Sequence, residues 1–134
     1  MGPGIRCAVL LAAWPGPFAI GSPSQTQPAA KPLNDEGVRA LLAGDYGKAL
    51  ERFQRAAKLA PNDSSISFNE GLACFIRGQY REAIGPLRRS MADPGSAEKA
   101  RYLLGASHYQ IGDLAAAARD CTDRRCVRSR SRSS

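Results

Sequence analysis

Between residues 34 and 121, segments with apolar residues every three to four positions alternate with short breaks rich in Gly, Pro, Asn and Asp. This spacing predicts helices, because positions i, i+3, i+4 and i+7 share one helix face. Turn residues pair the helices, with expected caps at Asp63 and Ser96. The predicted class is all-α. The expected first helices span 34–43, 64–77 and 96–111, and the second helices 46–59, 80–91 and 114–121.

The chain overlays on itself when it is shifted by 34 residues, and this period is typical of a helical solenoid. A glycine that follows a first helix suits the end of a helix. The other Gly and Ala sets let two helices approach closely, because each position carries no side chain or one methyl group. The aligned sets are Gly37, Gly71 and Gly105; Gly44, Gly78 and Gly112; Ala49, Ala83 and Ala117; Tyr46, Tyr80 and Leu114; and Phe53, Leu87 and Cys121.

The first unit, from Gly37 to Pro61, resembles the tetratricopeptide repeat (TPR) family at almost every defining position. The second unit also follows the family pattern, with Ser90 where Ala is usual, whereas the third departs from it at Cys121 and Arg124. The resemblance covers about residues 33–121. It implies an α-solenoid of about two and a half to three helix-turn-helix units, and a role in binding proteins or peptides without naming the ligand. The implied units are 33–63, 64–97 and an incomplete 98–121.

The family resemblance also implies a binding groove, because the first helix of each TPR unit lines a concave surface. Apolar and aromatic side chains there suit an extended or helical peptide with apolar anchors. Phe68, Lys99 and Tyr102 are favoured for ligand contact, whereas Leu41, Phe75 and Tyr109 could equally belong to the core between repeats. The implied groove residues are Asn34, Val38, Leu41, Leu42, Phe68, Asn69, Leu72, Phe75, Lys99, Tyr102, Ala106 and Tyr109.

Some TPR domains clamp the C-terminal carboxylate of a peptide with Lys, Asn and Arg side chains. Asn69 and Lys99 match two of those five positions. Asn34 stands where the family has Lys, Val38 replaces an Asn, and Leu103 replaces the Arg. The loss of two cations leaves too little charge-assisted hydrogen bonding for a carboxylate, so a chaperone-tail clamp is disfavoured.

The sequence offers no catalytic, metal-binding or cofactor-binding pattern, so we expect a non-catalytic protein without cofactors. Cys121 and Cys126 are five residues apart, unlike a zinc-binding pair, and at most they form a disulfide. Cys74 is expected to be a small core residue. His108 occupies the same repeat position as Cys74, which predicts a structural histidine that is partly buried with its polar atoms satisfied.

The N-terminal region is typical of an export signal. Residues 1–21 combine an early positive charge, an apolar stretch over 7–14 and small residues before Ser22. Export to the periplasm or medium of a bacterial-type cell is expected if this signal is real, and a cytoplasmic location otherwise. Contact with a membrane is expected only if the segment stays uncleaved. Residues 22–32 are interpreted as a Pro/Gln/Ala linker.

The net charge of +7 arises mainly at the ends of the chain, because the repeat region is nearly neutral. This distribution disfavours a nucleic-acid-binding domain. Residues 122–134 are rich in Arg and Ser and are expected to be disordered. The third repeat stops before a capping helix and leaves an open apolar face, so self-association through it is a further hypothesis.

Three functional hypotheses remain open from the sequence. The leading one is an exported scaffold that binds a protein or peptide in its concave groove. The second is an N-terminal docking segment of a larger enzyme or regulator, cut short by truncation or a frame shift. The third is an RNA-associated protein that uses the Arg/Ser tail.

Overall fold

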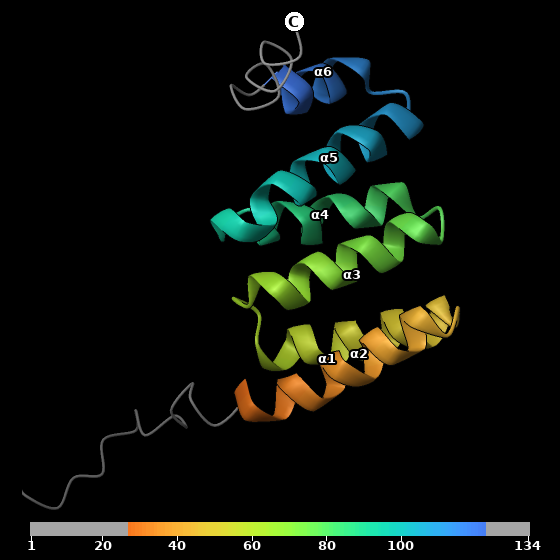
Figure 1. Ribbon diagram of the computed structural model, residues 1–134. Coiled ribbons are helices and arrows are strands. Elements are labelled where there is room, and N and C mark those ends of the chain that lie inside the picture. Colours follow the sequence, from red (N-terminus) through yellow and green to blue (C-terminus); the bar gives the residue numbers. More distant parts are fainter. Residues whose placement is uncertain (1–26, 123–134) are drawn as a thin grey trace, which may run out of the picture.

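The computed structural model describes residues 27–122, which form six helices and no strand (Figure 1). No helix in this range is long and apolar enough to cross a membrane. The expected signal segment, residues 22–26 of the expected linker and the Arg/Ser residues from 123 onward lie outside the described residues. The helices are α1 (Gln27–Leu42), α2 (Tyr46–Leu59), α3 (Ser64–Ile76), α4 (Tyr80–Ser90), α5 (Pro94–Gln110) and α6 (Leu114–Thr122).

The helices pack as three successive hairpins that stack along one axis, from α1 and α2 at the bottom of Figure 1 to α6 at the top. Among the described residues α1 contacts α3 and α3 contacts α5, whereas α2 and α4 do not touch, nor do α4 and α6. The stack is therefore tighter on the side of the first helices, which makes that side concave. The predicted all-α solenoid of helix pairs is confirmed.

Each hairpin turns at a glycine whose backbone only glycine adopts readily. Gly44, Gly78 and Gly112 have φ angles of +80°, +75° and +82°, in the left-handed region where a Cβ atom is disfavoured. Two backbone hydrogen bonds close the first turn, from the amide of Gly44 to Leu41 O (3.1 Å) and from that of Asp45 to Ala40 O (2.9 Å). The same pair of bonds recurs 34 and 68 residues later, so the role expected for these glycines is confirmed.

Asp residues cap the helices that follow the turns between hairpins. The Asp63 carboxylate accepts hydrogen bonds from the amides of Ser65 and Ile66, at 2.9 and 3.1 Å, as predicted. The expected cap at Ser96 is wrong, because α5 begins two residues earlier. Asp93 is its N-cap and Pro94 stands in the first turn, where the missing amide costs no hydrogen bond.

The expected linker is wrong for residues 27–32, because α1 begins at Gln27 and not near Asn34. Pro28 lies in the first turn of α1, where proline is tolerated. Ala30 is almost fully buried and packs with Ala56 of α2, with Ala60 just after that helix, and with Ile66 of α3. Tertiary burial of this alanine therefore extends the helix through a segment whose own composition indicates a linker.

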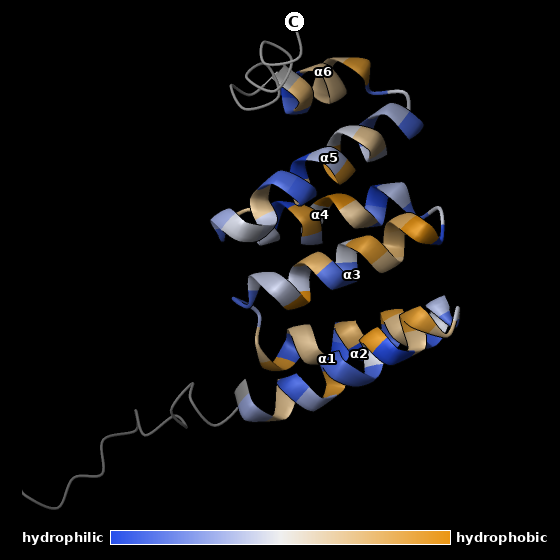
Figure 2. Ribbon diagram, viewed as in Figure 1, coloured by the Kyte–Doolittle hydropathy of each residue, from blue (hydrophilic) through white to orange (hydrophobic). Residues whose placement is uncertain are grey.

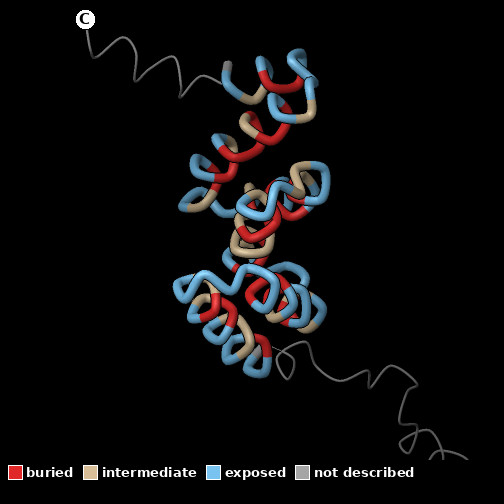
Figure 3. The backbone as a smooth tube through the Cα atoms, turned by 90° about the vertical axis from the view of Figure 1, so that its right-hand side faces the viewer, coloured by how far each residue is buried: buried red, intermediate tan, exposed pale blue. Residues whose placement is uncertain are grey.

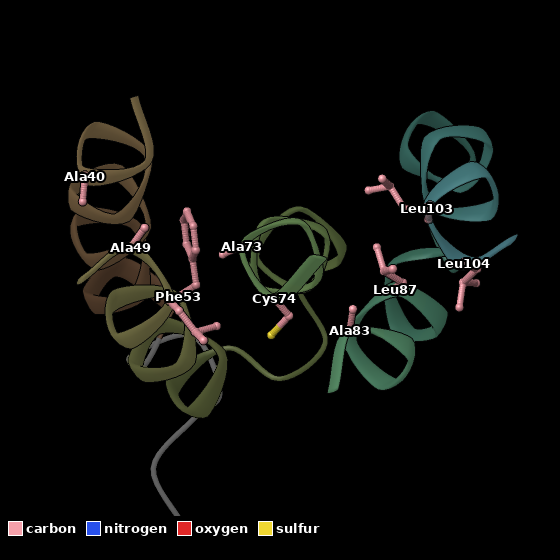
Figure 4. Packing of buried hydrophobic residues seen from close by; sticks show 11 residues of the cluster. Ala40, Ala49, Phe53, Ala73, Cys74, Ala83, Leu87, Leu103 and Leu104 are labelled. Carbon is pink, nitrogen blue, oxygen red and sulfur yellow. The ribbon is translucent and has the colours of Figure 1, made fainter. Parts of the chain in front are cut away.

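Buried residues occur in every helix of the stack, alternating with exposed positions along the backbone (Figure 3). Figure 4 shows Phe53 beside Ala49 and Ala73, and Leu87 in the next layer with Ala83, Leu103 and Leu104. Phe53 lies against Gly37 and Leu87 against Gly71, so that a Cβ atom at either glycine would be 2.6 Å from the opposing side chain. This close approach is the physical reason for the glycine register.

Candidate functional site

The concave face of α1, α3 and α5 carries the predicted groove residues, but their exposure differs along the stack. Leu42 is 82% exposed, Tyr102 76% and Tyr109 65%, and Lys99 is also exposed. Ile76, which the sequence analysis did not place in the groove, is 42% exposed beside them. The remaining predicted residues are half-buried between neighbouring first helices. They are Asn34, Val38, Leu41, Phe68, Asn69, Leu72, Phe75 and Ala106.

The structure differs from the sequence interpretation in which of these residues are exposed for ligand contact and which pack in the core. Phe68, which was favoured for ligand contact, is half-buried and packs against the core cluster, as do Leu41 and Phe75. The Phe75 ring also meets Tyr80 edge-on, with ring centroids 5.3 Å apart. Tyr102 and Tyr109 are instead exposed on α5, the first helix of the third repeat. Apolar colour in Figure 2 is strong at the C-terminal end of α3, where Phe75 and Ile76 lie.

The positions that would form a carboxylate clamp are occupied by other interactions. Asn69 Nδ2 donates a hydrogen bond of 2.9 Å to Asn34 Oδ1 and so ties α3 to α1. Leu103 is buried in the core cluster with Leu104 and Leu87, so its position offers nothing to a ligand. Lys99 is the one cation at the five matched positions. These contacts add a structural reason to the expectation that no carboxylate clamp forms.

Two hollows of opposite character lie at the two ends of the stack. An apolar hollow of about 420 Å³ lies between α5 and α6. A hollow of about 360 Å³ on α1 and α2 is lined largely by charged side chains, including Glu36, Arg39 and Arg52. The stack therefore has one polar and one apolar end. The apolar hollow is lined by Tyr102, Gly105, Ala106, Tyr109, Gln110, Leu114, Ala117, Ala118 and Cys121.

His108 lies between α5 and α6 behind this hollow. The predicted burial is confirmed, but the expectation that its polar atoms are satisfied is wrong. Its Nδ1 lies 3.9 Å from Asp113 Oδ2, and its Nε2 lies 3.6 Å from Asp120 Oδ2. Both distances exceed a hydrogen bond. Among the described residues, His108 Nδ1 and Asp120 Oδ2 are left without a hydrogen-bond partner, because the Asp113 and Asp120 carboxylates both lie too far from the ring.

The surroundings of Glu70 on α3 shift the pKa of its carboxyl group. Burial raises its pKa, and the attraction and hydrogen bond of Arg89, at 2.9 Å on α4, oppose that shift. A carboxyl group with a raised pKa in the folded chain supports folding fully only at a pH below its ordinary pKa of 4.5. That support is lost as the pH rises through the raised value.

Substituting Glu70→Gln is therefore expected to stabilise the protein relative to the original chain more at pH 7 than at pH 4. Urea denaturation at both pH values measures the difference in free energy of unfolding. Glu51→Gln is the matched control, because Glu51 pairs with Arg55 on the exposed surface of α2. A Glu70 variant that loses more stability at pH 7 than at pH 4 would contradict this assignment.

Cys74 is buried against the core, as predicted, and its thiol is protected. Burial, together with the nearby Glu70 and Glu82 carboxylates, raises the pKa of Cys74 to about 11. We expect a thiol reagent at pH 7.5 to modify Cys121, which is exposed, well before Cys74, because only the thiolate reacts. Peptide mass spectrometry after timed labelling measures both sites. Modification of Cys74 at the same rate in the folded chain would contradict its packing.

Comparison with known proteins agrees with this arrangement. The tetratricopeptide repeat family model matches residues 34–97. The N-terminal domain of stress-induced protein-1 (STI-1) from C. elegans superposes with a TM-score of 0.67 at 20% identity, covering 78% of this chain and 93% of that one. The matched repeat region belongs to the tetratricopeptide repeat family. This TPR chain also superposes on the first TPR of Spaghetti (RPAP3), bound to the HSP90 peptide SRMEEVD, with a TM-score of 0.65 at 21% identity, over 70% of this chain and 75% of that one.

Curated relatives of the TPR chain are longer proteins. DnaJ homolog subfamily C member 7 of Mus musculus is 26% identical over 67% of this chain, which spans 18% of that protein's length. Small glutamine-rich tetratricopeptide repeat-containing protein 2 of Mycosarcoma maydis is 33% identical over 62% of the chain, which spans 24% of it. The chain therefore corresponds to less than a quarter of each of these relatives.

Sequence reasoning proposed first-helix positions for a groove but missed the second-helix side of the apolar hollow. Leu114, Ala117 and Cys121 were assigned only to the repeat register. The signal that could have found them is the same 34-residue shift, since each aligns with a residue in the preceding repeat that is buried or half-buried.

Proposed function

We propose that this TPR chain is a non-catalytic scaffold that holds a protein or peptide segment on its concave first-helix face. The observation that carries the proposal is the position of its exposed large apolar residues. Four of the six such residues in the described part of the chain, Leu42, Ile76, Tyr102 and Tyr109, lie on first helices, and their repeat positions fall within one helical stripe; the other two are on second helices. Such exposed anchors are typical of surfaces that bind a partner segment.

The comparisons support peptide binding as the class of activity, because the superposed RPAP3 repeats were solved with a bound HSP90 peptide. The chemistry of recognition proposed for this chain differs from a carboxylate clamp. Leu103 is buried and Asn34 bonds to Asn69, so a peptide carboxylate would meet Lys99 alone. We therefore assign recognition to apolar anchors.

The proposal is tested with a peptide selected by display against the full chain and measured by calorimetry. Leu42→Ser and Ile76→Ser are each expected to weaken its binding at least about tenfold, because each removes an aliphatic anchor worth about 1.5–3 kcal/mol. Leu114→Ser is the matched control, since Leu114 is exposed on α6 and lies off the concave face. Unchanged binding in both concave-face variants would contradict the proposal.

The peptide SRMEEVD serves as a second probe, and we expect no saturable binding to this chain at about 1 mM. Tight binding that depends on Lys99 would show a carboxylate clamp and overturn the assignment to apolar anchors. Export remains a proposal that rests on residues 1–21. The intact mass of the protein from an exported cell fraction, lacking those residues, would support it.

The alternative of a docking segment in a larger enzyme or regulator is favoured by the length of the two curated relatives described above, of which this chain spans less than a quarter. In that case the same concave face would position the rest of the protein. Association with RNA through the Arg/Ser residues stays a prediction. Heparin retention that is lost when 122–134 are deleted would support it.

A further inference from the structure

The apolar hollow between α5 and α6 is the third copy of a surface that is covered twice elsewhere in the stack. Shifted back by 34 residues, its lining falls on the α3–α4 surface that α5 covers. Shifted back by 68 residues, it falls on the α1–α2 surface that α3 covers. The equivalents in the second repeat are Phe68, Gly71, Leu72, Phe75, Ile76, Tyr80, Ala83, Ile84 and Leu87.

Equivalent residues of the second and third repeats differ in exposure, because α5 covers the second repeat and no described helix covers the third. Leu87 is fully buried, whereas its equivalent Cys121 is exposed. Phe68 is half-buried against the core, whereas Tyr102 stands three-quarters exposed. Leu114 is 62% exposed, whereas the equivalent Tyr80 is half-buried. The third repeat therefore has the same shape as the second, and no helix of the described residues covers it.

The two helices that do cover such a surface define the chemistry of the occupant. α5 buries Ala100, Leu103, Leu104 and Ser107, a stripe at i, i+3, i+4 and i+7. α3 buries Ile66 and Ala73 seven residues apart, and Ile66 packs between Ala56 and Ala60. The occupant that fits is an amphipathic α-helix with small and aliphatic residues on one stripe.

Two occupants available within this sequence do not fit that description. Residues 123–134 carry Cys126 and Val127 as their only apolar side chains, so they cannot supply the stripe. A second copy stacked end to end would present α1, which has Pro32, Glu36 and Arg39 at the positions of Ala100, Leu104 and Ser107. The two charged residues would be desolvated against an apolar surface at high cost.

We propose that the α5–α6 hollow is a docking site for an amphipathic α-helix of a partner protein, seated as α3 sits on α1 and α2. This inference goes beyond the proposed function, because it places a second partner surface at the end of the stack. Tyr102 and Tyr109 line both surfaces, whereas Leu114, Ala117 and Cys121 belong to the hollow alone. The docked helix would extend the solenoid by one element.

The probe is a fluorescent peptide with the sequence of residues 93–110, which carries its own cap at Asp93 and the stripe of α5. Saturable binding to the full chain is expected by anisotropy. Ala106→Arg fills the hollow and should weaken binding at least tenfold, whereas Leu42→Arg, outside the hollow, should not. Leu114→Arg, at the exposed start of α6, repeats the test if Ala106→Arg lowers the helical content seen by circular dichroism. A peptide carrying Leu104→Arg should not bind.

Several results would overturn the docking site. They are no saturable binding, equal binding of the Leu104→Arg peptide, and binding that survives both hollow variants. Sedimentation equilibrium of the chain alone tests whether a second copy occupies the hollow. A dimer that is lost on Leu114→Arg would assign the hollow to a second copy. Failure of the docking site can be distinguished from failure of the proposed function, because binding of the display-selected peptide is expected to depend on Leu42 and Ile76 and not on Leu114.

Discussion

Phe53→Ala is expected to lower the free energy of unfolding by about 3–5 kcal/mol. The Phe53 ring is fully buried and lies against Gly37, where an added Cβ atom would be only 2.6 Å from the ring. Its core neighbours include Ala40, Ala49 and Ala73, whose side chains are single methyl groups. These residues cannot extend to fill the space, so the deletion leaves a cavity as well as a loss of apolar burial.

Urea denaturation followed by circular dichroism at 222 nm measures the effect. Leu42→Ala is the matched control, because Leu42 is a large apolar residue exposed on the neighbouring helix, and its change should stay within about 0.5 kcal/mol. A loss of less than about 1 kcal/mol for Phe53→Ala would mean that the first hairpin closes over the gap. That result would contradict the tight approach of α1 to α2.

Much of the fold could be predicted from residues that recur every 34 positions, because local geometry requires these residue types. Gly44 must adopt a positive φ, and Gly37 must make room for Phe53. Each requirement involves a turn or one neighbouring helix. A repeat copies such requirements unchanged, so three copies of a weak signal become a strong one.

The rest depends on contacts that no single segment contains. Residues 27–32 have the composition of a linker, yet Ala30 is buried against Ala56 of α2, and α1 begins at Gln27. Phe68 and Tyr102 occupy the same repeat position, but α5 packs against the first and no described element covers the second. Exposure on the concave face is therefore set by the next repeat along the stack and not by the residue type.

The glycine that supports the second hairpin should also be sensitive to substitution, although less so than Phe53. Gly71→Ala is expected to destabilise the protein by about 1–3 kcal/mol, the cost of overpacking a well-filled site. Its new Cβ would lie 2.6 Å from Leu87 Cγ and 3.2 Å from the Leu87 backbone nitrogen. Leu87 is fully buried, so neither its side chain nor its backbone can move aside cheaply.

Two further alanine substitutions separate this steric cost from the general effect of replacing a helical glycine. Gly85→Ala on α4 has open space around it and should stabilise the protein by about 0.5–1 kcal/mol, because alanine favours the helix. Gly105→Ala would meet Cys121 Sγ at 3.1 Å and other atoms only at 3.8 Å, so its cost should fall between the other two. Urea denaturation of the three variants gives the order of their changes in the free energy of unfolding. Equal losses at Gly71 and Gly105 would show that the bulk of the opposing side chain does not decide the cost, whereas the expected order ties it to Leu87 and Cys121.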